Sequence, residues 1–279
     1  MSPNRNLYSS RMSKNTTSVA LVAGTSSGLG RAVAERLVEL GWEVIGTVRG
    51  NGTELPFETV HCDVTDDEAV ARLGQFVFER WGRLDALVNN AGISLTGPME
   101  ELDPKELRSI LDVNLVAPMA LARACLPALR AASGVIIQIS SVAGYSSSEL
   151  FGAYQASKFG LEGASEALQG EVSGQNVRVV LIEPGAFGIE IAVKGIQAGA
   201  KGSTGLYQSS WVEVDAWLQW HATAGPNPAE CVAAIVGAAT LRDAPFRIPV
   251  GEDICEELRR KGGEMIAQAD AAEAFLLSL

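Results

Sequence analysis

The chain is poor in the side chains that bind transition metals. Its 279 residues include two histidines and four cysteines, and no two cysteines form a Cys-x-x-Cys pair. The one compact group, His61-Cys62-Asp63, is expected in a strand, where adjacent side chains point to opposite faces. We therefore predict no metal site. Free thiols in a reducing compartment are expected, which favours a cytoplasmic location, for Cys62, Cys125, Cys231 and Cys255.

The sequence also lacks excess positive charge and long apolar runs. Its net charge is -11, and no segment interleaves basic with aromatic residues. An acidic chain is repelled by nucleic-acid phosphates and by anionic membrane surfaces. No apolar run approaches the ~20 residues that cross a bilayer. We therefore expect neither nucleic acid nor a membrane as a partner.

Hydrophobic residues make up 47% of the chain, enough for a sizeable core, so residues 18–279 are expected to form one domain. Residues 1–17 differ, because they contain three basic residues and no acidic one. That composition resembles an organelle transit peptide. Pro3-Asn4-Arg5-Asn6 does not fit an amphipathic helix, however, so a disordered tail is the favoured interpretation.

A glycine-rich segment lies near the N-terminus. Gly24-Thr25-Ser26-Ser27-Gly28-Leu29-Gly30 follows the apolar run 18–23 and precedes residues 31–40, whose apolar side chains recur at helical spacing. This order predicts a strand, a tight turn and a helix. Glycines let the backbone approach a pyrophosphate, whose charge then lies at the helix N-terminus. The segment predicts a dinucleotide site, and a glycine-rich surface turn is the alternative.

Beyond this unit, segments with the patterns of strands and helices keep alternating. The alternation predicts an α/β fold built on a Rossmann-type doubly wound parallel sheet. The expected strands are 42–48, 59–62, 84–88, 134–140, 177–182 and 246–250. The expected helices are 66–81, 104–130 and 152–172.

Tyr154 and Lys158 lie one turn apart on the same face of the expected helix 152–172. A phenol ionises near pH ~10 in water, and a fixed ammonium nearby favours the phenolate. The spacing therefore predicts a tyrosine of lowered pKa that exchanges a proton near neutral pH. Taken alone, the pair also fits a solvated lysine beside a half-buried tyrosine.

Together, several motifs resemble the classical short-chain dehydrogenase/reductase family over residues 18–251. The family's glycine motif matches Gly24, Gly28 and Gly30, and its Asn-Asn-Ala-Gly matches Asn89-Asn90-Ala91-Gly92. Its buried asparagine, its serine and its Tyr-x-x-x-Lys match Asn114, Ser141 and Tyr154 with Lys158, and its Pro-Gly matches Pro184-Gly185. Their agreement in order and spacing outweighs the separate structural explanation of each motif.

The resemblance implies an oxidoreductase that interconverts a carbonyl and an alcohol by hydride transfer with a nicotinamide cofactor. Ser141 would bind the substrate oxygen, and Tyr154 would give it a proton or remove one. Lys158 would lower the tyrosine pKa and bind the nicotinamide ribose, while Asn114 would anchor a water of a proton relay. The implied cofactor contacts are Gly24, Ser26, Ser27, Gly28, Leu29, Gly30, Arg49, Asp63, Val64, Asn90, Ala91, Gly92, Tyr154, Lys158, Pro184, Gly185, Phe187 and Ile189.

Cofactor choice depends on the end of the expected strand 42–48. NAD-binding members of this fold carry an acid about twenty residues after the glycine motif, where it binds the ribose hydroxyls. Here that position holds Val48, and Arg49 follows with a fork of donors suited to a 2′-phosphate. Ser27 offers a further hydroxyl. NADP(H) is therefore favoured, and NAD(H) is the alternative cofactor. Arg49 could instead be a solvated loop residue that binds no phosphate. The resemblance assigns Asp63 and Val64 to contacts with the adenine ring.

Two positions depart from the family pattern. Ala23 replaces a threonine whose hydroxyl ties the glycine turn to neighbouring backbone, so a less rigid turn is expected. Ile189 replaces a threonine that binds the nicotinamide carboxamide in many members, so backbone groups of 186–189 are expected to orient it.

Residues 186–225 are too long for an ordinary connection and follow the strand after which this family carries its substrate lid. They contain the aromatic residues Phe187, Tyr207, Trp211, Trp217 and Trp220. These predict an apolar wall for a hydrophobic ketone or secondary alcohol, although packing of the lid on the core or on a neighbouring subunit is equally supported. The motifs 47–49 and 183–187 resemble the hydroxysteroid and retinol dehydrogenase-like branch.

Other functions fit the sequence less well. A cofactor-binding regulator on this fold normally loses part of the serine, tyrosine and lysine set, which is complete here. A sugar-nucleotide epimerase or dehydratase would resemble the extended branch, with another glycine spacing and a longer C-terminal domain. NAD-linked alcohol oxidation is a further alternative. Family members commonly pair their long helices, so a homodimer or homotetramer through 104–130 and 152–172 is expected.

Overall fold

The computed structural model describes residues 17–50, 54–185, 187, 205–225 and 227–278. Its centre is a parallel sheet of seven strands in the order β3-β2-β1-β4-β5-β6-β7. The strands are β1 (Val19–Ala23), β2 (Glu43–Val48), β3 (Glu58–His61), β4 (Ala86–Asn89), β5 (Val135–Ile139), β6 (Arg178–Pro184) and β7 (Arg247–Val250). The α-helices are α1 (Gly28–Glu39), α2 (Asp67–Trp81), α3 (Pro104–Leu111), α4 (Ala117–Ala132), α5 (Gly152–Val172), α7 (Gln208–Ala224), α8 (Ala229–Thr240) and α9 (Ile254–Leu277). Short segments of π-helix and 3-10 helix are η1 (Asp112–Val116), η2 (Val142–Gly144) and η3 (Ser173–Gln175).

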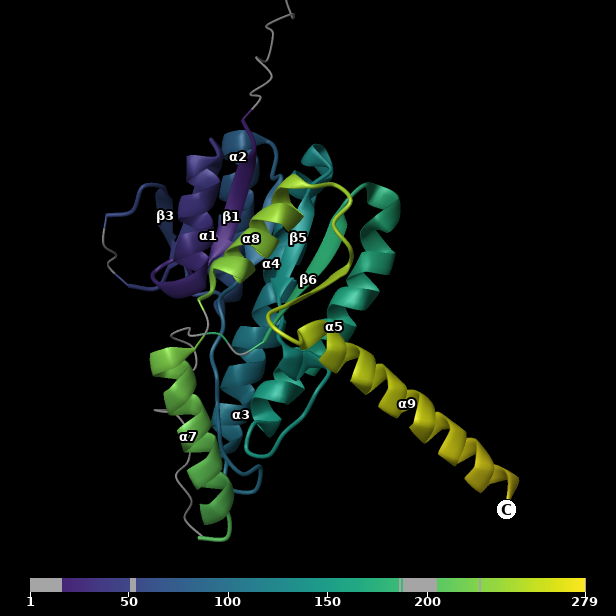
Figure 1. Cartoon of the computed structure of the whole chain (residues 1–279). Helices are drawn as coiled ribbons and strands as arrows, with labels where there is room; N and C mark the ends of the chain where they lie inside the picture. The colour runs from purple at the N-terminus through teal and green to yellow at the C-terminus, as the bar shows by residue number, and fades with distance from the viewer. Residues whose placement is uncertain (1–16, 51–53, 186, 188–204, 226, 279) are drawn as a thin grey trace, which may run out of the picture.

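Helices cover both faces of the sheet (Figure 1). α2 and α4 pack on one face, and α1 and α8 pack on the other. This arrangement confirms the predicted doubly wound fold. The strand order reverses between β1 and β4, and such a reversal leaves a crevice at the carboxyl ends of the strands. Ala23 lies opposite Asn89 in the register, so the glycine segment and the Asn-Asn-Ala-Gly segment begin side by side.

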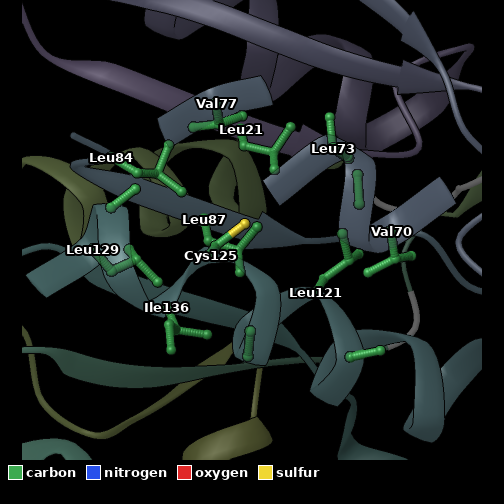
Figure 2. Packing of buried hydrophobic residues seen from close by; sticks show 14 of the residues in the cluster. Leu21, Val70, Leu73, Val77, Leu84, Leu87, Leu121, Cys125, Leu129 and Ile136 are labelled. Carbon is green, nitrogen blue, oxygen red and sulfur yellow. The ribbon is translucent and has the colours of Figure 1, made fainter. Parts of the chain in front are cut away.

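Strand β1 joins two hydrophobic cores. Leu21 belongs to the cluster with α2 and α4, and Val22 belongs to the cluster with α1 and α8. Figure 2 shows part of the first cluster, with Leu87 of β4 beside Cys125 of α4. All five residues of β1 are fully buried, as is expected for a parallel strand that is covered on both faces.

The predicted helix 104–130 is observed as one helix that runs from α3 through the π turn η1 to the end of α4. By length and composition alone, Pro104–Ala132 is apolar enough to cross a membrane, which corrects the expectation that no segment approaches this length. Its most apolar window is 39% buried, and Leu121, Cys125 and Leu129 pack against the sheet (Figure 2). A core helix of a soluble protein passes the same test.

Three helices toward the C-terminus have no counterpart in the sequence-based predictions. α7 lies within the predicted lid, α8 covers the sheet, and α9 runs outward from the body to the C-terminus (Figure 1). None of the residues of α9 is buried. The predicted strands, in contrast, all overlap observed ones, including 246–250 with β7.

Candidate active site

The four residues of the predicted reacting set come from three parts of the fold. Ser141 follows β5, Tyr154 and Lys158 lie in the first turns of α5, and Asn114 lies in the π turn η1. Parallel strands bring their carboxyl ends to one edge of the sheet, and the glycine segment after β1 reaches the same edge. The structure therefore places the expected chemistry and the expected dinucleotide segment on the same side of the sheet.

Ser141 and Tyr154 are joined by a side-chain hydrogen bond. The Ser141 hydroxyl oxygen also accepts a hydrogen bond from the Ala143 amide at 3.1 Å, because Ser141 caps the short helix η2. Its hydroxyl lies 3.4 Å from the carbonyl oxygen of Pro184, the last residue of β6. Contacts with three elements therefore fix the position of the serine oxygen beside the phenol.

The pKa of Tyr154 differs in direction from the sequence-based prediction. Burial raises the pKa of Tyr154, and the hydrogen bond with Ser141 offsets only part of this rise. The Lys158 ammonium lies 5.7 Å from the centre of the tyrosine ring. In the protein alone, burial is therefore the largest influence on the phenol, which stays protonated at neutral pH.

Lys158 is nearly enclosed, with 4% of its surface exposed. Its ammonium donates a hydrogen bond to the carbonyl oxygen of Ile139 at 2.7 Å. Burial lowers the pKa of Lys158 to about 8, although the carboxylate of Glu162, one turn further along α5, acts to raise it. The lysine therefore carries its charge at neutral pH and loses it in mildly alkaline solution.

Asn114 forms hydrogen bonds that hold the segment after β4. Its side-chain oxygen accepts from the Ile93 amide at 2.9 Å, and its amide nitrogen donates to the Ile93 carbonyl oxygen at 2.9 Å. The same nitrogen donates to the Ser157 hydroxyl at 3.0 Å. The π turn η1 aims the side chain at these groups, and such turns occur often at functional sites. Asn114 thus connects the Asn-Asn-Ala-Gly strand end to the helix that carries Tyr154.

The glycine segment is packed as tightly as a pyrophosphate site requires. A Cβ atom at Gly30 would lie 2.3 Å from the side-chain nitrogen of Asn90 and 2.3 Å from the carbonyl oxygen of Gly24. The Asn90 amide donates hydrogen bonds of 3.0 Å to the carbonyl oxygens of Ala23 and Gly24. Gly24 has φ +78°, and its Cβ would meet Ala91 at 3.0 Å. Only glycine fits these two positions.

The hydroxyl that Ala23 lacks is supplied from another strand. Thr47 of β2 accepts a hydrogen bond from the Gly24 amide through its hydroxyl at 3.0 Å. The Thr25 amide donates to the Thr47 carbonyl oxygen at 3.0 Å. The turn is therefore tied to strand β2 by hydrogen bonds although position 23 is alanine.

The N-terminus of α1 suits an anionic group. The helix begins at Gly28, where φ is +60° and where a Cβ would meet nothing within 4 Å. Ser27 is the N-cap residue but makes no side-chain capping hydrogen bond, and no acid lies in the first turn. Amide groups and the positive end of the helix dipole are thus directed at an open space beside exposed Ser26 and buried Leu29. These residues fit a dinucleotide pyrophosphate.

The remaining predicted cofactor residues are distributed around the same edge. Arg49 is exposed directly after β2, and its carbonyl oxygen lies 2.8 Å from His61 Nε2. The Asp63 carboxylate accepts hydrogen bonds from the Thr65 amide at 2.9 Å and from its hydroxyl at 2.7 Å, which lower the pKa of Asp63. Val64 is buried. Gly92 and Gly185 follow β4 and β6, whereas Ile189 lies outside the described residues.

A cavity of about 550 Å³ opens beside Ser141 and Tyr154. It is lined by residues of the segments after β4 and β5, of α5, of the segment after β6 and of α7. The lining consists of Ser94, Ser141, Val142, Ala143, Ser146, Ser147, Ser148, Glu149, Phe151, Tyr154, Gln155, Gly185, Phe187, Ser210, Glu213, Val214, Trp217 and Leu218. Seven of these residues, in η2 and in 146–151, carry no family motif, so sequence patterns alone do not reveal them.

The predicted aromatic wall is only partly present. Phe187 and Trp217 line the cavity, and Trp217 packs edge-on against Phe151 with ring centres 5.7 Å apart. Trp211 is buried but does not line the cavity, and Trp220 is 53% exposed and also lies outside the lining. The Tyr207 hydroxyl donates a hydrogen bond to Glu100 at 2.6 Å on the surface. The tryptophan stripe is thus divided between the cavity, the core and solvent because a helix turns its residues to different faces.

A buried charge cluster behind the lysine is also missed by sequence patterns. Glu162 of α5 and Glu183 of β6 both pair with Arg247 of β7, the second at 2.7 Å. Burial and the nearby Glu162 carboxylate raise the pKa of Glu183 to about 7, and Arg247 acts to lower it. Three side chains that are far apart in sequence therefore form one charge cluster, and its member Glu162 also acts on Lys158.

A glycine turn at the strand-order reversal, together with the set Ser141, Tyr154 and Lys158, is the arrangement expected of a Rossmann-type oxidoreductase. A family model described as short chain dehydrogenase matches residues 18–197, more than half of the chain. The protein belongs to the short-chain dehydrogenase family. Its family and its oxidoreductase class are thus as the motifs predict.

Curated relatives include reductases and dehydrogenases of several substrates. The chain is 32% identical over 235 residues to the 3-ketodihydrosphingosine reductase of Bacteroides thetaiotaomicron, covering 84% of this chain and 87% of that protein. It is 36% identical over 195 residues to the NADPH-dependent 3-dehydrocapnine reductase of Ornithobacterium rhinotracheale, covering 64% and 69%. Human retinol dehydrogenase 16 is 39% identical over 186 residues, covering 62% and 58%. The similarity to retinol dehydrogenases is as predicted.

Solved structures share the fold over most of the chain. A short-chain dehydrogenase from Streptomyces avermitilis has 33% identity and a TM-score of 0.77, with 94% of this chain and 97% of that one covered. A metagenomic short-chain oxidoreductase solved in complex with NADP has 30% identity and a TM-score of 0.64, with 84% and 96% covered.

Proposed function

We propose that the protein interconverts a hydrophobic ketone or aldehyde and its alcohol with NADP(H), with Tyr154 as the acid and base. The observation that carries the proposal is the Ser141–Tyr154 hydrogen bond at the wall of a 550 Å³ cavity, with Lys158 enclosed behind the phenol. A substrate oxygen in this cavity reaches both hydroxyl groups. The complete set argues against a regulator that only binds the cofactor.

Each residue has a separate task in this proposal. Ser141, already fixed by its contacts with Ala143 and Pro184, donates a hydrogen bond to the substrate oxygen. Tyr154 donates its proton to that oxygen in reduction, and its raised pKa keeps the proton on the phenol until the oxygen becomes basic. Lys158 stabilises the phenolate that remains. The bound nicotinamide supplies or accepts the hydride.

Proton return follows from the position of the lysine. Lys158 loses its proton with a pKa of about 8, so it can pass a proton toward the phenolate at physiological pH. Asn114 holds the Ile93 backbone on one side and Ser157 on the other, and the Ser157 hydroxyl donates to the Tyr154 carbonyl oxygen at 2.6 Å. We propose that Asn114 fixes the position of α5 and carries the water of the relay.

NADP(H) is the favoured cofactor, and NAD(H) is the alternative. Arg49 is exposed at the end of β2, beside the glycine segment, and the preceding residue is Val48 rather than an acid that would repel a phosphate. A relative is named as NADPH-dependent, and one similar structure contains NADP. Arg49→Ala should raise the KM for NADPH about tenfold or more, because a charged hydrogen bond contributes ~1.5–3 kcal/mol, and leave that for NADH unchanged. Arg36→Ala, on the far end of α1, is the matched control.

The cavity favours an uncharged or amine-bearing substrate over an acid. Phe151, Phe187 and Trp217 supply aromatic surface, and Glu149 and Glu213 are the charged residues among the described side chains of its lining. No Lys or Arg occurs in that lining, so a carboxylate or phosphate would lack a partner there. Relatives named for 3-ketodihydrosphingosine and retinol act on long hydrophobic molecules, which agrees with this choice.

The organisation around the site is part of the proposal. We propose that residues 18–279 act as one domain in which 186–225, including α7, forms a lid over the cavity. We also propose that the protein forms a homodimer or homotetramer through the long helices 104–130 and 152–172, and that it is located in the cytoplasm. The lid assignment rests on Ser210, Trp217 and Leu218, which line the cavity from α7.

A substrate panel tests the proposed function. NADPH or NADH oxidation is followed with retinal-like aldehydes, steroid ketones, long-chain amino ketones, aryl ketones and keto acids. Turnover with NADPH and a neutral or amine-bearing carbonyl is the expected result. Tight NADPH binding without turnover of any carbonyl or alcohol would favour the regulator, and a clear preference for keto acids would overturn the substrate assignment.

A further inference from the structure

The C-terminal helix α9 has no packing partner along most of its length. It extends from Ile254 to Leu277, no residue in it is buried, and it runs away from the body of the protein (Figure 1). Met265, Ile266, Phe275, Leu276 and Leu277 are between 63% and 84% exposed. A lone helix of this kind is marginal in water, because helices in proteins are stabilised mainly by packing of an apolar face.

The sequence of α9 contains a continuous uncharged stripe at the spacing of a helix pair. Leu258, Gly262, Met265, Ala269, Ala272 and Leu276 follow one another at intervals of four and three residues. This alternation keeps the six side chains on one face, as at the contact positions of a coiled coil. The stripe begins where α9 leaves the body and continues to its last turn.

Two adjacent glycines support a close helix contact. Gly262 and Gly263 lie inside α9, where glycine is among the least favourable residues. A Cβ atom at either position would meet nothing within 4 Å, so the packing of the single chain does not require glycine there. A second helix lying against Gly262 would require it, because small side chains allow two helix axes to approach.

We propose that α9 pairs in antiparallel orientation with α9 of a second copy of this chain. In that orientation Leu258 meets Leu276 of the partner subunit, Gly262 meets Ala272 of the partner subunit, and Met265 meets Ala269 of the partner subunit. Ile266 then meets its own copy near the two-fold axis. The bulky Met265 faces a small alanine, Gly262 and Ala272 form a close contact of two small residues, and the two leucines close both ends of the contact.

The charges on α9 match this orientation. Arg259 and Glu273 flank the stripe on one side, and the antiparallel pair brings Arg259 next to Glu273 of the partner subunit, twice by symmetry. Neither side chain forms an ion pair within the described part of the chain. Arg260, on the opposite face, is already paired with Glu257 and Glu264. The unsatisfied charges thus flank the proposed contact, and the satisfied ones face solvent.

A membrane surface fits α9 less well than a second copy. The helix contains five acidic and three basic residues, so an anionic bilayer repels it. Its basic residues occupy 259–261, near its N-terminus, and its later acids occupy 270 and 273, near its C-terminus. An antiparallel pair places the basic end of one helix beside the acidic end of the other, whereas a lipid surface offers no such match.

The test compares two full-length variants that carry the same substitution on opposite faces of α9. Ala269→Glu inserts a charge into the stripe, and Ala267→Glu inserts it on the outer face. Mass is measured by light scattering and sedimentation over a concentration series, with turnover as the control for folding. We expect Ala269→Glu to halve the assembly mass and Ala267→Glu to leave it unchanged. A wild type that is monomeric at every concentration, or equal masses for all three proteins, would overturn the proposal.

A charge exchange tests the orientation. Arg259→Glu and Glu273→Arg should each weaken the assembly, and the double variant should restore it, because it exchanges the two members of one intermolecular pair. A parallel pair or the interface through 104–130 and 152–172 predicts no restoration. Flotation of the wild type with phosphatidylcholine vesicles, together with unchanged masses of the variants, would replace the second copy by a membrane.

Discussion

Replacing Gly30 by alanine tests whether the tight glycine segment serves the cofactor. The new methyl group would lie 2.3 Å from both the Asn90 side-chain nitrogen and the Gly24 carbonyl oxygen. Neither atom moves freely, because the Asn90 amide is held by two hydrogen bonds of 3.0 Å and the Gly24 oxygen is backbone. Overpacking of this kind costs about 1–3 kcal/mol.

That cost appears in one of two measurements, depending on how the turn responds. If the turn stays in place, the free energy of unfolding falls by ~1–3 kcal/mol. Tm then falls by ~2–4 °C for each kcal/mol lost. If the turn opens, stability is kept, but cofactor binding must close it again, and the Kd for NADPH rises roughly five- to 150-fold. Thermal unfolding and NADPH fluorescence titration together measure both quantities.

A second glycine-to-alanine variant serves as the control, because it separates the effect of crowding at Gly30 from the general effect of replacing a glycine. Gly237 lies inside α8, and a Cβ there would meet nothing within 4 Å. Gly237→Ala should stabilise the protein by ~0.5–1 kcal/mol and leave NADPH binding unchanged. If Gly30→Ala matched the wild type in both Tm and Kd, the assignment of this turn to the pyrophosphate would be wrong.

Two further predictions concern the charges behind Tyr154. Burial lowers the pKa of Lys158 to about 8, and the Glu162 carboxylate acts to raise it, so kcat/KM for reduction should fall above about pH 8. Glu162→Gln should move this fall to lower pH. Glu166→Gln, a substitution on the exposed face of the same helix, should leave the pH profile unchanged. An unmoved profile in Glu162→Gln would remove that carboxylate from the account. The pKa of Glu183 is raised from its usual 4.5 to about 7, so its protonation stabilises the fold fully below about pH 4.5, and up to ~3 kcal/mol of this is lost as pH rises through 7. Glu183→Gln should abolish that slope in urea unfolding measured at about pH 5 and about pH 8, and an unchanged slope would contradict the assignment.

The sequence alone predicts the fold and the position of the reacting set. Ser141, Tyr154 and Lys158 stand in recognisable order, and the buried apolar strands have the pattern of a parallel sheet, so local patterns and tertiary structure agree. The glycine segment is predictable for the same reason, since its turn and its packing both require glycine at Gly24 and Gly30.

Other features depend on contacts between distant segments, which no local pattern encodes. The pKa of Tyr154 is predicted in the wrong direction because the spacing of Lys158 is visible in the sequence while the burial of the phenol is not. The cluster around Arg247 joins three elements whose neighbours appear only after folding. The sequence leaves Trp220 open between a cavity wall and packing of the lid, and only the rotation of α7 shows that it lies outside the lining and is 53% exposed.

Tyr154→Phe tests the central claim most directly, because it removes one oxygen atom and retains the ring. Cofactor affinity and Tm should stay close to those of the wild type, since the ring keeps its packing against the buried cluster of Leu95, Ile110 and Ala153. Turnover in both directions should fall by at least the ~10²–10⁴-fold that a positioned acid contributes. A variant that binds NADPH normally and retains near-normal kcat would show that Tyr154 does not transfer the proton.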